Sequence, residues 1–118
     1  MSKAENYHCN VSVTLAIIGG KWKSLILWQL SFKTLRFSQL QRRLAKVTQK
    51  MLTQQLRELE KDGLIHRKVY AEVPPRVEYS LTELGKSVVP ILQLMYQWGN
   101  DYLAMTEQPA LADCQMEQ

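Results

Sequence analysis

The sequence predicts a single α+β domain in which helices predominate. Its 118 residues match the usual size of one domain. Apolar residues recur at helical spacing through residues 11–62 and again through residues 82–105. Between these regions, residues 65–81 change to an alternating pattern that is typical of strands. This order predicts four short helices, a hairpin and a long C-terminal helix.

The first two helices are predicted at residues 11–18 and 21–31. In the first, Val11, Leu15 and Ile18 fall at helical spacing, and Gly19 follows as a helix stop. In the second, apolar side chains are so frequent that they form a wide face. A wide apolar face predicts that this helix lies in the core.

A helix pair follows at residues 38–45 and 49–62. Leu40 and Leu44 are the inward residues of the first member. Thr48 is the expected N-cap of the second member, and Gly63 ends it. The connection between the two helices is therefore only a few residues long.

A hairpin is predicted from two strands, Ile65–Tyr70 and Arg76–Leu81. The segment between them holds Pro74 and Pro75, which cannot both join a hydrogen-bonded ladder. Thr82 then caps a helix that runs to about residue 105, and Pro90 is expected to kink it without ending it. We expect residues 1–105 to form the domain and the polar residues 106–118 to be disordered.

Two short helices followed by a two-stranded hairpin are the arrangement of a winged helix-turn-helix, in which the hairpin is the wing. The second helix of the pair then enters the major groove of DNA. On a helical wheel, Leu52, Leu56 and Leu59 form its buried stripe. Its opposite arc offers side chains that donate to base edges and phosphates. That arc consists of Lys50, Thr53, Gln54, Arg57 and Lys61.

The charge distribution agrees with a DNA partner. Residues 21–76 hold 13 Lys and Arg against 4 Asp and Glu, a net charge of +9, whereas residues 77–118 have a net charge of −5. A solvated basic face on an unrelated domain gives the same balance, so the helix pair and the hairpin are what favour DNA. The candidate DNA-binding residues are Arg36, Ser38, Gln39, Arg42, Arg43, Gln49, Lys50, Thr53, Gln54, Arg57, Lys68 and Arg76.

The predicted C-terminal helix has an apolar pattern that suggests a dimer interface. It has apolar residues at alternating spacings of three and four, which is typical of a helix–helix seam. We expect this seam and the first helix to form the interface of a homodimer, although packing on its own domain is the alternative. Two-fold symmetry then places two recognition helices about 34 Å apart and predicts a palindromic site. The expected interface residues are Val11, Leu15, Ile18, Val88, Ile91, Met95, Trp98 and Tyr102.

Several segments, in this order, resemble the HxlR family of bacterial winged-helix regulators, relatives of the MarR type. They are Cys9–Val11, Ile18–Lys23, Arg36–Leu40, Gln49–Glu60, Asp62–Leu64, Val73–Thr82 and Leu84–Gly85. Asn10 stands where the family commonly has Pro, and Thr48 where Ser is usual. The resemblance covers about residues 9–103. It implies a homodimeric, sequence-specific transcription factor of the bacterial cytoplasm that usually acts near its own operon.

Cys9 is the candidate sensor. It lies at the start of the first helix, where the helix dipole favours a thiolate, and Lys3, Lys21 and Lys23 add positive charge if they fold nearby. The resemblance implies a sensor of oxidants or electrophiles, because several family members use an N-terminal cysteine in this way. Modification would shift the first helix and change the separation of the two recognition helices. The alternative is a small buried apolar residue. Cys114 is expected to have no role.

Other functions find little support. No apolar run approaches 18 residues, and no secretory signal is visible. Two cysteines are too few for the disulfide scaffold of a secreted protein and are most simply cytosolic thiols. We therefore expect a cytoplasmic protein without a membrane partner. The sequence has no phosphate loop, nucleophile elbow or paired carboxylates, so we expect no enzyme. His8 and Cys9 lack a second ligand pair, so we expect neither a metal nor a cofactor.

Two rival functions remain. One is a winged helix that serves only protein–protein contacts, for which DNA binding and its steep salt dependence would be absent. The other is a regulator controlled by a small ligand in a pocket between helices, with Cys9 merely structural. Trp22, Trp28 and Trp98 are candidates to line such a pocket, although aromatic residues at helical spacing more often belong to a core.

Overall fold

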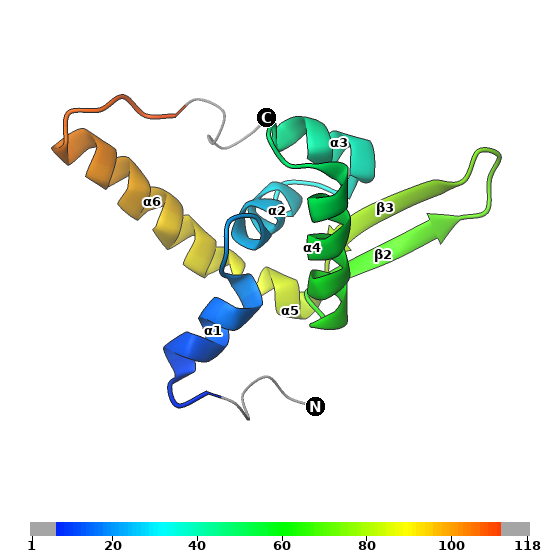
Figure 1. Cartoon of the computed structure of the whole chain (residues 1–118), viewed down its shortest axis with the longest axis horizontal. Coiled ribbons are helices and arrows are strands. Elements are labelled where there is room, and N and C mark those ends of the chain that lie inside the picture. The colour runs from blue at the N-terminus through cyan, green and yellow to red at the C-terminus, as the bar shows by residue number, and fades with distance from the viewer. Residues whose placement is uncertain (1–6, 112–118) are drawn as a thin grey trace.

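The computed structural model describes residues 7–111 and has the predicted winged helix-turn-helix fold (Figure 1). The helix pair α3–α4 stands beside α2, and the hairpin β2–β3 projects from the body as the wing. The elements are α1 (Asn10–Ile18), α2 (Lys23–Leu30), β1 (Leu35–Arg36), α3 (Phe37–Arg43), α4 (Gln49–Lys61), β2 (Ile65–Tyr70), β3 (Arg76–Leu81), α5 (Glu83–Lys86) and α6 (Val89–Met105).

The sheet has three antiparallel strands in the order β1-β3-β2, so the predicted two-stranded wing is confirmed as β2–β3 and a third strand, which the sequence did not predict, lies beside β3. The β2–β3 hairpin has the predicted bounds. The additional strand β1 pairs Leu35 with Tyr79 and Arg36 with Glu78. Since Leu35 and Tyr79 are both buried, this short strand fastens the base of the wing to the helical core.

The core is built mainly from leucine and isoleucine of α2, α3 and α4. Leu52, Leu56 and Leu59 form the buried stripe of α4, as predicted, and Ile26 and Leu27 of α2 are fully buried with them. The stripe fixes the rotation of α4 about its axis. Its polar side chains therefore point away from the domain.

Both ends of α4 are defined by local hydrogen bonds. The Thr48 Oγ1 atom accepts from the Met51 N–H at 3.0 Å, which confirms the predicted N-cap. At the other end, the Leu64 N–H donates to the Leu59 carbonyl oxygen at 3.0 Å across Gly63, whose φ is 83°. This left-handed conformation favours glycine, so the predicted stop is also confirmed.

The predicted single C-terminal helix is divided into α5 and α6. The Thr82 Oγ1 atom accepts from the Gly85 N–H at 3.0 Å and donates to the Gly63 carbonyl oxygen at 2.6 Å, so the cap also ties α5 to the end of α4. Pro90 lies in the first turn of α6. Because the first N–H groups of a helix have no intrahelical partner, proline is tolerated there. Pro90 therefore begins a new helix, where the sequence predicted a kink within one.

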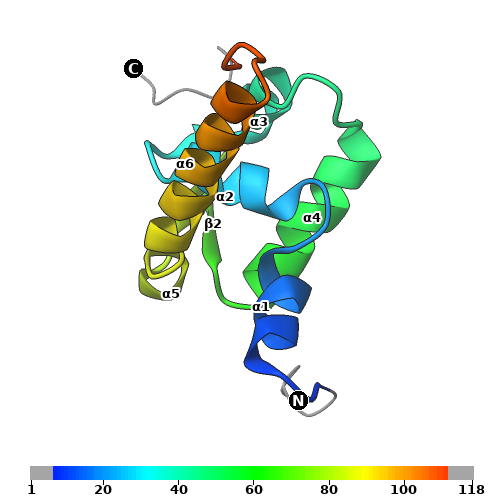
Figure 2. The ribbon, with the colours of Figure 1, turned by 90° about the vertical axis from the view of Figure 1, so that its left-hand side faces the viewer.

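A cluster of three aromatic side chains packs α6 against the body of the domain. The rings of Trp28 and Tyr96 are stacked with centroids 5.4 Å apart, and Phe32 meets Trp28 edge-on at 5.1 Å. Leu92 is buried beside them. The remainder of α6 extends outward, and Figure 2 shows α1 and α6 on the side of the molecule away from the wing.

Two residues predicted at the dimer seam belong to the domain's own core. Ile18 is 4% exposed and lies in the core cluster, and Val88 is half-buried against that cluster. The cause is the same in both cases, because each residue lies at the end of α1 or α6 that joins the body. Beyond α6, Ala110 and Leu111 line a cavity beside that helix.

Within residues 7–111 no single helix is long and apolar enough to cross a membrane, and only α1 and α2 together, bent by 73°, reach that length and composition.

Candidate nucleic-acid interface

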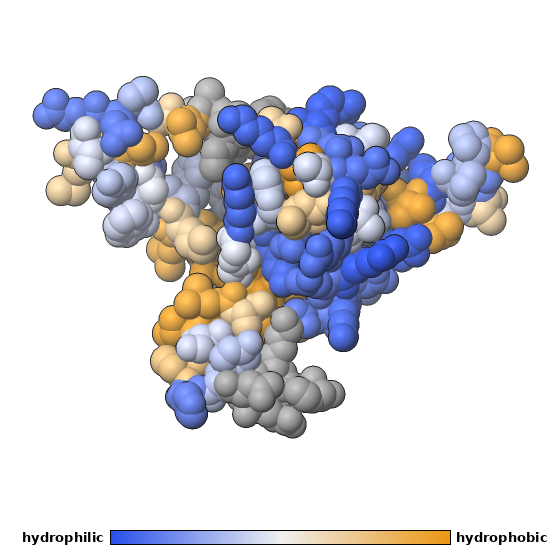
Figure 3. Space-filling model, viewed as in Figure 1, coloured by the Kyte–Doolittle hydropathy of each residue, from blue (hydrophilic) through white to orange (hydrophobic). Residues whose placement is uncertain are grey.

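The polar face of α4 consists of Gln49, Lys50, Thr53, Gln54 and Arg57, of which Thr53 is half-buried and the others are exposed. These five residues, with Thr48 and Glu58, line a shallow hollow of about 880 Å³ along the helix. Figure 3 shows mostly hydrophilic surface over this part of the molecule, while the wing has both hydrophilic and apolar areas. The face has no acid before Glu58, so the N-terminal half of α4 can approach phosphates without repulsion.

Contacts within α4 orient part of this face. The Thr53 Oγ1 atom donates to the Gln49 carbonyl oxygen at 2.8 Å, and the Gln54 Nε2 atom donates to a Glu58 carboxylate oxygen at 3.3 Å. Glu58 also forms an ion pair of 2.6 Å with Lys23 Nζ of α2. Sequence reasoning missed this pair, since the two residues are far apart in the chain.

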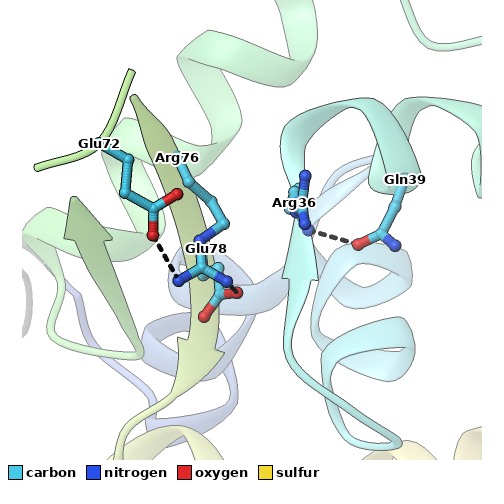
Figure 4. Close-up of polar contacts among 5 residues, drawn as sticks. All are labelled: Arg36, Gln39, Glu72, Arg76 and Glu78. Carbon is cyan, nitrogen blue, oxygen red and sulfur yellow. Dashed lines mark hydrogen bonds and ion pairs between the residues drawn. The ribbon is translucent and has the colours of Figure 1, made fainter. Parts of the chain in front are cut away.

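The predicted DNA-binding residues in and next to α3 differ in what their side chains do. Ser38 and Arg42 are exposed. Gln39 has a structural task, because its Oε1 atom accepts from the Arg36 backbone N–H at 2.8 Å and so stabilises the start of α3 (Figure 4). The Arg36 side chain is exposed next to the base of the wing.

Arg43 lies apart from the polar face of α4. Its Nη1 atom donates to Gln29 Oε1 of α2 at 3.1 Å. It lines a different hollow, of about 340 Å³, together with Lys21, Lys46 and the end of the described chain at Leu111. The structure therefore does not bring Arg43 to the hollow along α4.

The wing uses Arg76 differently from the sequence prediction of a phosphate contact. Its two terminal nitrogens form ion pairs with Glu72 at 3.0 Å and Glu78 at 3.2 Å (Figure 4). Its guanidinium also lies 3.9 Å from the ring centroid of Tyr70. Arg76 thus ties the two strands of the wing together. Lys68 also lies over the Tyr70 ring, with its Nζ atom 4.9 Å from the ring centroid, but its side chain is exposed.

A second groove connects α4 with the sheet. It has a volume of about 400 Å³, and Arg57 of α4 and Arg67 of β2 both line it. Like Lys68 and Arg76, Arg67 flanks the wing, where the sequence suggests that a basic side chain reaches phosphates, but it is not among the candidate DNA-binding residues given above. The alternation of side chains along β2 is the signal that separates it from Lys68, because neighbouring strand residues point to opposite faces.

Cys9 is exposed and is the residue immediately before α1, as predicted. Its carbonyl oxygen accepts from the Ser12 N–H at 2.9 Å. Lys21 and Lys23 lie beyond the other end of α1, a helix about 13 Å long, so they do not supply the expected positive charge beside the thiol. Lys3 and Cys114 lie outside the described residues. Residues 7–111 contain no group of three or more potential metal-ligating side chains.

Comparison with protein families decides the assignment. The family described as HxlR-like helix-turn-helix matches residues 17–107, which include α2, the helix pair, the wing and α6. The chain belongs to the HxlR family. Like its relatives, this HxlR protein is a helix-turn-helix transcriptional regulator.

Similar proteins support the family and the fold. An uncharacterized HTH-type transcriptional regulator of Methanothermobacter thermautotrophicus is 59% identical over 98 residues, which cover 83% of this chain and 75% of that protein. The redox regulator HypR in its oxidized form is 49% identical, with a TM-score of 0.77 over 79% of this chain and 96% of HypR. The reduced form of the regulator YodB from B. subtilis is 30% identical, with a TM-score of 0.70 over 81% of this chain and 95% of YodB.

Proposed function

We propose that this HxlR protein binds a palindromic DNA operator as a homodimer, with α4 in the major groove and the wing against the flanking backbone. The observation that carries the proposal is the polar face of α4, which presents amide, hydroxyl and guanidinium groups outward while its leucine stripe is buried. Side chains of these types read base edges. Arg42 and Lys68 are exposed nearby and suit phosphate contacts.

An apolar face, defined by Val11, Leu15, Ile91, Met95, Trp98 and Tyr102, supports the dimer. On α6, Leu92 and Tyr96 mark the stripe that packs on α2. The α6 residues of the apolar face lie about 60–120° around that helix from Leu92, and Trp98 is still 68% exposed there. Figure 3 shows apolar surface over α1 and the adjoining part of α6. An exposed patch of this kind marks an interaction surface.

A selection experiment tests DNA binding. The purified chain is mixed with a pool of duplexes whose central segment is randomised, and the bound fraction is sequenced. We expect an enriched palindrome whose half-sites lie about one helical turn apart, and an affinity that falls steeply with added salt. The absence of any enriched sequence, together with weak salt dependence, would favour a function in protein–protein contacts alone.

We further propose that oxidants or electrophiles weaken operator binding through Cys9. Two observations support this: Cys9 is exposed next to the apolar face of α1, and redox regulators are among the similar structures. Oxidation that joins two thiols forms a disulfide, and the oxidant accepts the two electrons and two protons. A cross-link at the start of α1 would move that helix against its partner and change the separation of the two α4 helices. A coupling of 2–3 kcal/mol would alter the operator affinity roughly 30- to 150-fold.

Diamide, a thiol oxidant, provides the test. Operator affinity is measured with and without diamide for the natural chain, Cys9→Ser and Cys114→Ser. We expect diamide to weaken binding by the natural chain and by Cys114→Ser, but not by Cys9→Ser. Equal loss of affinity in all three proteins would exclude Cys9 as the sensor.

A second candidate, control by a small ligand, has one observation in its favour. Ser24, Leu25, Trp28, Met95 and Tyr96 line a mainly apolar cavity of about 190 Å³ between α2 and α6. A ligand there would contact both the body and the apolar face. Retained induction in a variant that lacks both cysteines would favour this mechanism over Cys9.

A further inference from the structure

A chain of three polar residues links the body of the protein to the polar face of α4. Lys23, the first residue of α2, has a side chain that is only 9% exposed. Its Nζ atom lies 2.6 Å from Glu58 Oε1, and the other oxygen of the same carboxylate accepts from Gln54 Nε2 at 3.3 Å. Glu58 therefore stands between a buried cation and a side chain that faces the proposed DNA.

The ion pair fixes the position of the Glu58 carboxylate. Lys23 is held by burial, so it offers its charge in one place, and Glu58 is 40% exposed where the pair meets solvent. A partly buried pair of this kind is screened less than a surface pair. Because Lys23 neutralises it, Glu58 can lie beside the polar face of α4 without adding a net negative charge there.

The fixed carboxylate in turn fixes which end of the Gln54 amide faces outward. A carboxylate only accepts hydrogen bonds, so it must face the NH2 end of the amide. One N–H of Gln54 is then occupied, and one N–H and the carbonyl oxygen remain for DNA. Adenine presents one acceptor and one donor in the major groove, which matches this remaining pair, whereas guanine presents two acceptors.

We infer that Glu58, held by Lys23, is a positioning residue that makes Gln54 prefer adenine over guanine at one base pair of the operator. This inference rests on the proposed DNA binding. It adds a specificity-determining role for two residues that need not touch DNA. Loss of the Glu58 carboxylate frees the amide to turn and to donate both N–H groups, so the discrimination against guanine falls.

The experiment begins with the selection described above, applied to the full chain and to Gln54→Ala. The base pair at which the natural chain selects one base but Gln54→Ala selects none is the position read by Gln54. We expect the natural chain to select adenine at this position. Affinities of the natural chain and of Glu58→Gln are then measured for the selected duplex and for a duplex with guanine at that position. We expect the natural chain to prefer adenine by about tenfold or more. In Glu58→Gln we expect this ratio to approach one.

Two further variants separate positioning from structural support. Asp101→Asn removes a comparable contact on α6, where Gln97 Nε2 donates to Asp101 Oδ1 at 3.0 Å, and it should leave the ratio unchanged. Lys23→Met combined with Glu58→Gln removes the buried ammonium together with its partner, so no uncompensated charge is left to unfold the protein. The double variant should show the same loss of discrimination as Glu58→Gln.

The outcomes are distinct. A guanine preference in the natural chain, an unchanged ratio in Glu58→Gln, or an equal loss of affinity for both duplexes would overturn the positioning role. An equal loss is what a purely structural role produces. The absence of any enriched sequence for the natural chain would instead contradict the proposed function itself.

Discussion

The two sides of the molecule reach stability in different ways. On the helix-turn-helix side, the leucine stripe of α4 is buried and the polar face is left in water, so one chain completes this unit by itself. On the α1–α6 side, large apolar residues such as Trp98 and Leu15 remain exposed. Exposed apolar area lowers stability in water until another surface covers it. One chain therefore completes the helix-turn-helix unit and still leaves its proposed dimer surface uncovered.

The two sides also differ in charge. The segment that holds the helix pair and most of the wing, residues 21–76, has a net charge of +9, whereas the described residues of α6 and beyond, 89–111, hold the acids Asp101 and Glu107 and no Lys or Arg. A basic reading surface attracts the DNA phosphates, and an acidic C-terminal segment weakens that attraction for the rest of the chain. This division favours one orientation of the protein on a duplex.

The largest expected effect comes from breaking the apolar face. Trp98→Glu places a charge at the centre of that face, so we expect the dimer to dissociate. A monomer holds one half-site only, and affinity for the palindrome should fall about 10²- to 10⁴-fold. Analytical ultracentrifugation and a gel-shift titration measure the two effects. Gln93→Glu puts the same charge on the polar side of α6 and should leave both unchanged; a dimeric Trp98→Glu protein would contradict the proposed interface.

The next effect compares Arg57 and Arg43, which the sequence analysis predicted to lie in the same DNA-binding surface. Arg57→Ala should cost about 1–3 kcal/mol of operator binding and relax the preference at one base pair. Arg43→Ala should cost much less, because Arg43 is bonded to Gln29 and lines a different hollow. Titration of both variants against the selected operator checks this order. The reverse order would mean that the DNA-facing surface includes α2.

The elements that the sequence predicted well carry local signals. Thr48 and Gly63 define α4 through hydrogen bonds made within a few residues, and Pro74 and Pro75 define the loop of the wing. The leucine stripe was equally readable, since helical spacing alone decides which residues share a face. The polar face of α4 followed directly from that stripe.

The features that the sequence could not supply depend on distant partners. Strand β1 has two residues and no periodicity of its own, so only its pairing with β3 defines it. Ile18 shares a stripe with Leu15, but only Ile18 lies at the end of α1 that joins the body, so it is buried while Leu15 is exposed. The Lys23–Glu58 pair joins two helices that no local pattern connects.

The wing provides a finer test, because two of its basic residues have different tasks. Lys68→Ala removes an exposed cation, so the salt dependence of binding should weaken by about one unit of slope. Arg76→Ala instead removes the link between Glu72, Glu78 and Tyr70, so amide hydrogen exchange in β2 and β3 should accelerate. Lys68→Ala serves as the control for exchange. Unchanged exchange in Arg76→Ala would show that the ion pairs do not order the wing.

The smallest effect concerns the stability of the reading helix itself. Thr48→Ala removes the Oγ1 acceptor for the Met51 N–H, so the free energy of unfolding should fall by about 1 kcal/mol. Thr48→Ser keeps the hydroxyl and should retain most of that stability. Urea denaturation followed by circular dichroism compares the two variants. Because the cap lies on the helix-turn-helix side, the loss should appear in a monomeric Trp98→Glu background as well. A loss confined to the dimer would mean that the helix-turn-helix side depends on the partner chain, against the independence of the two sides.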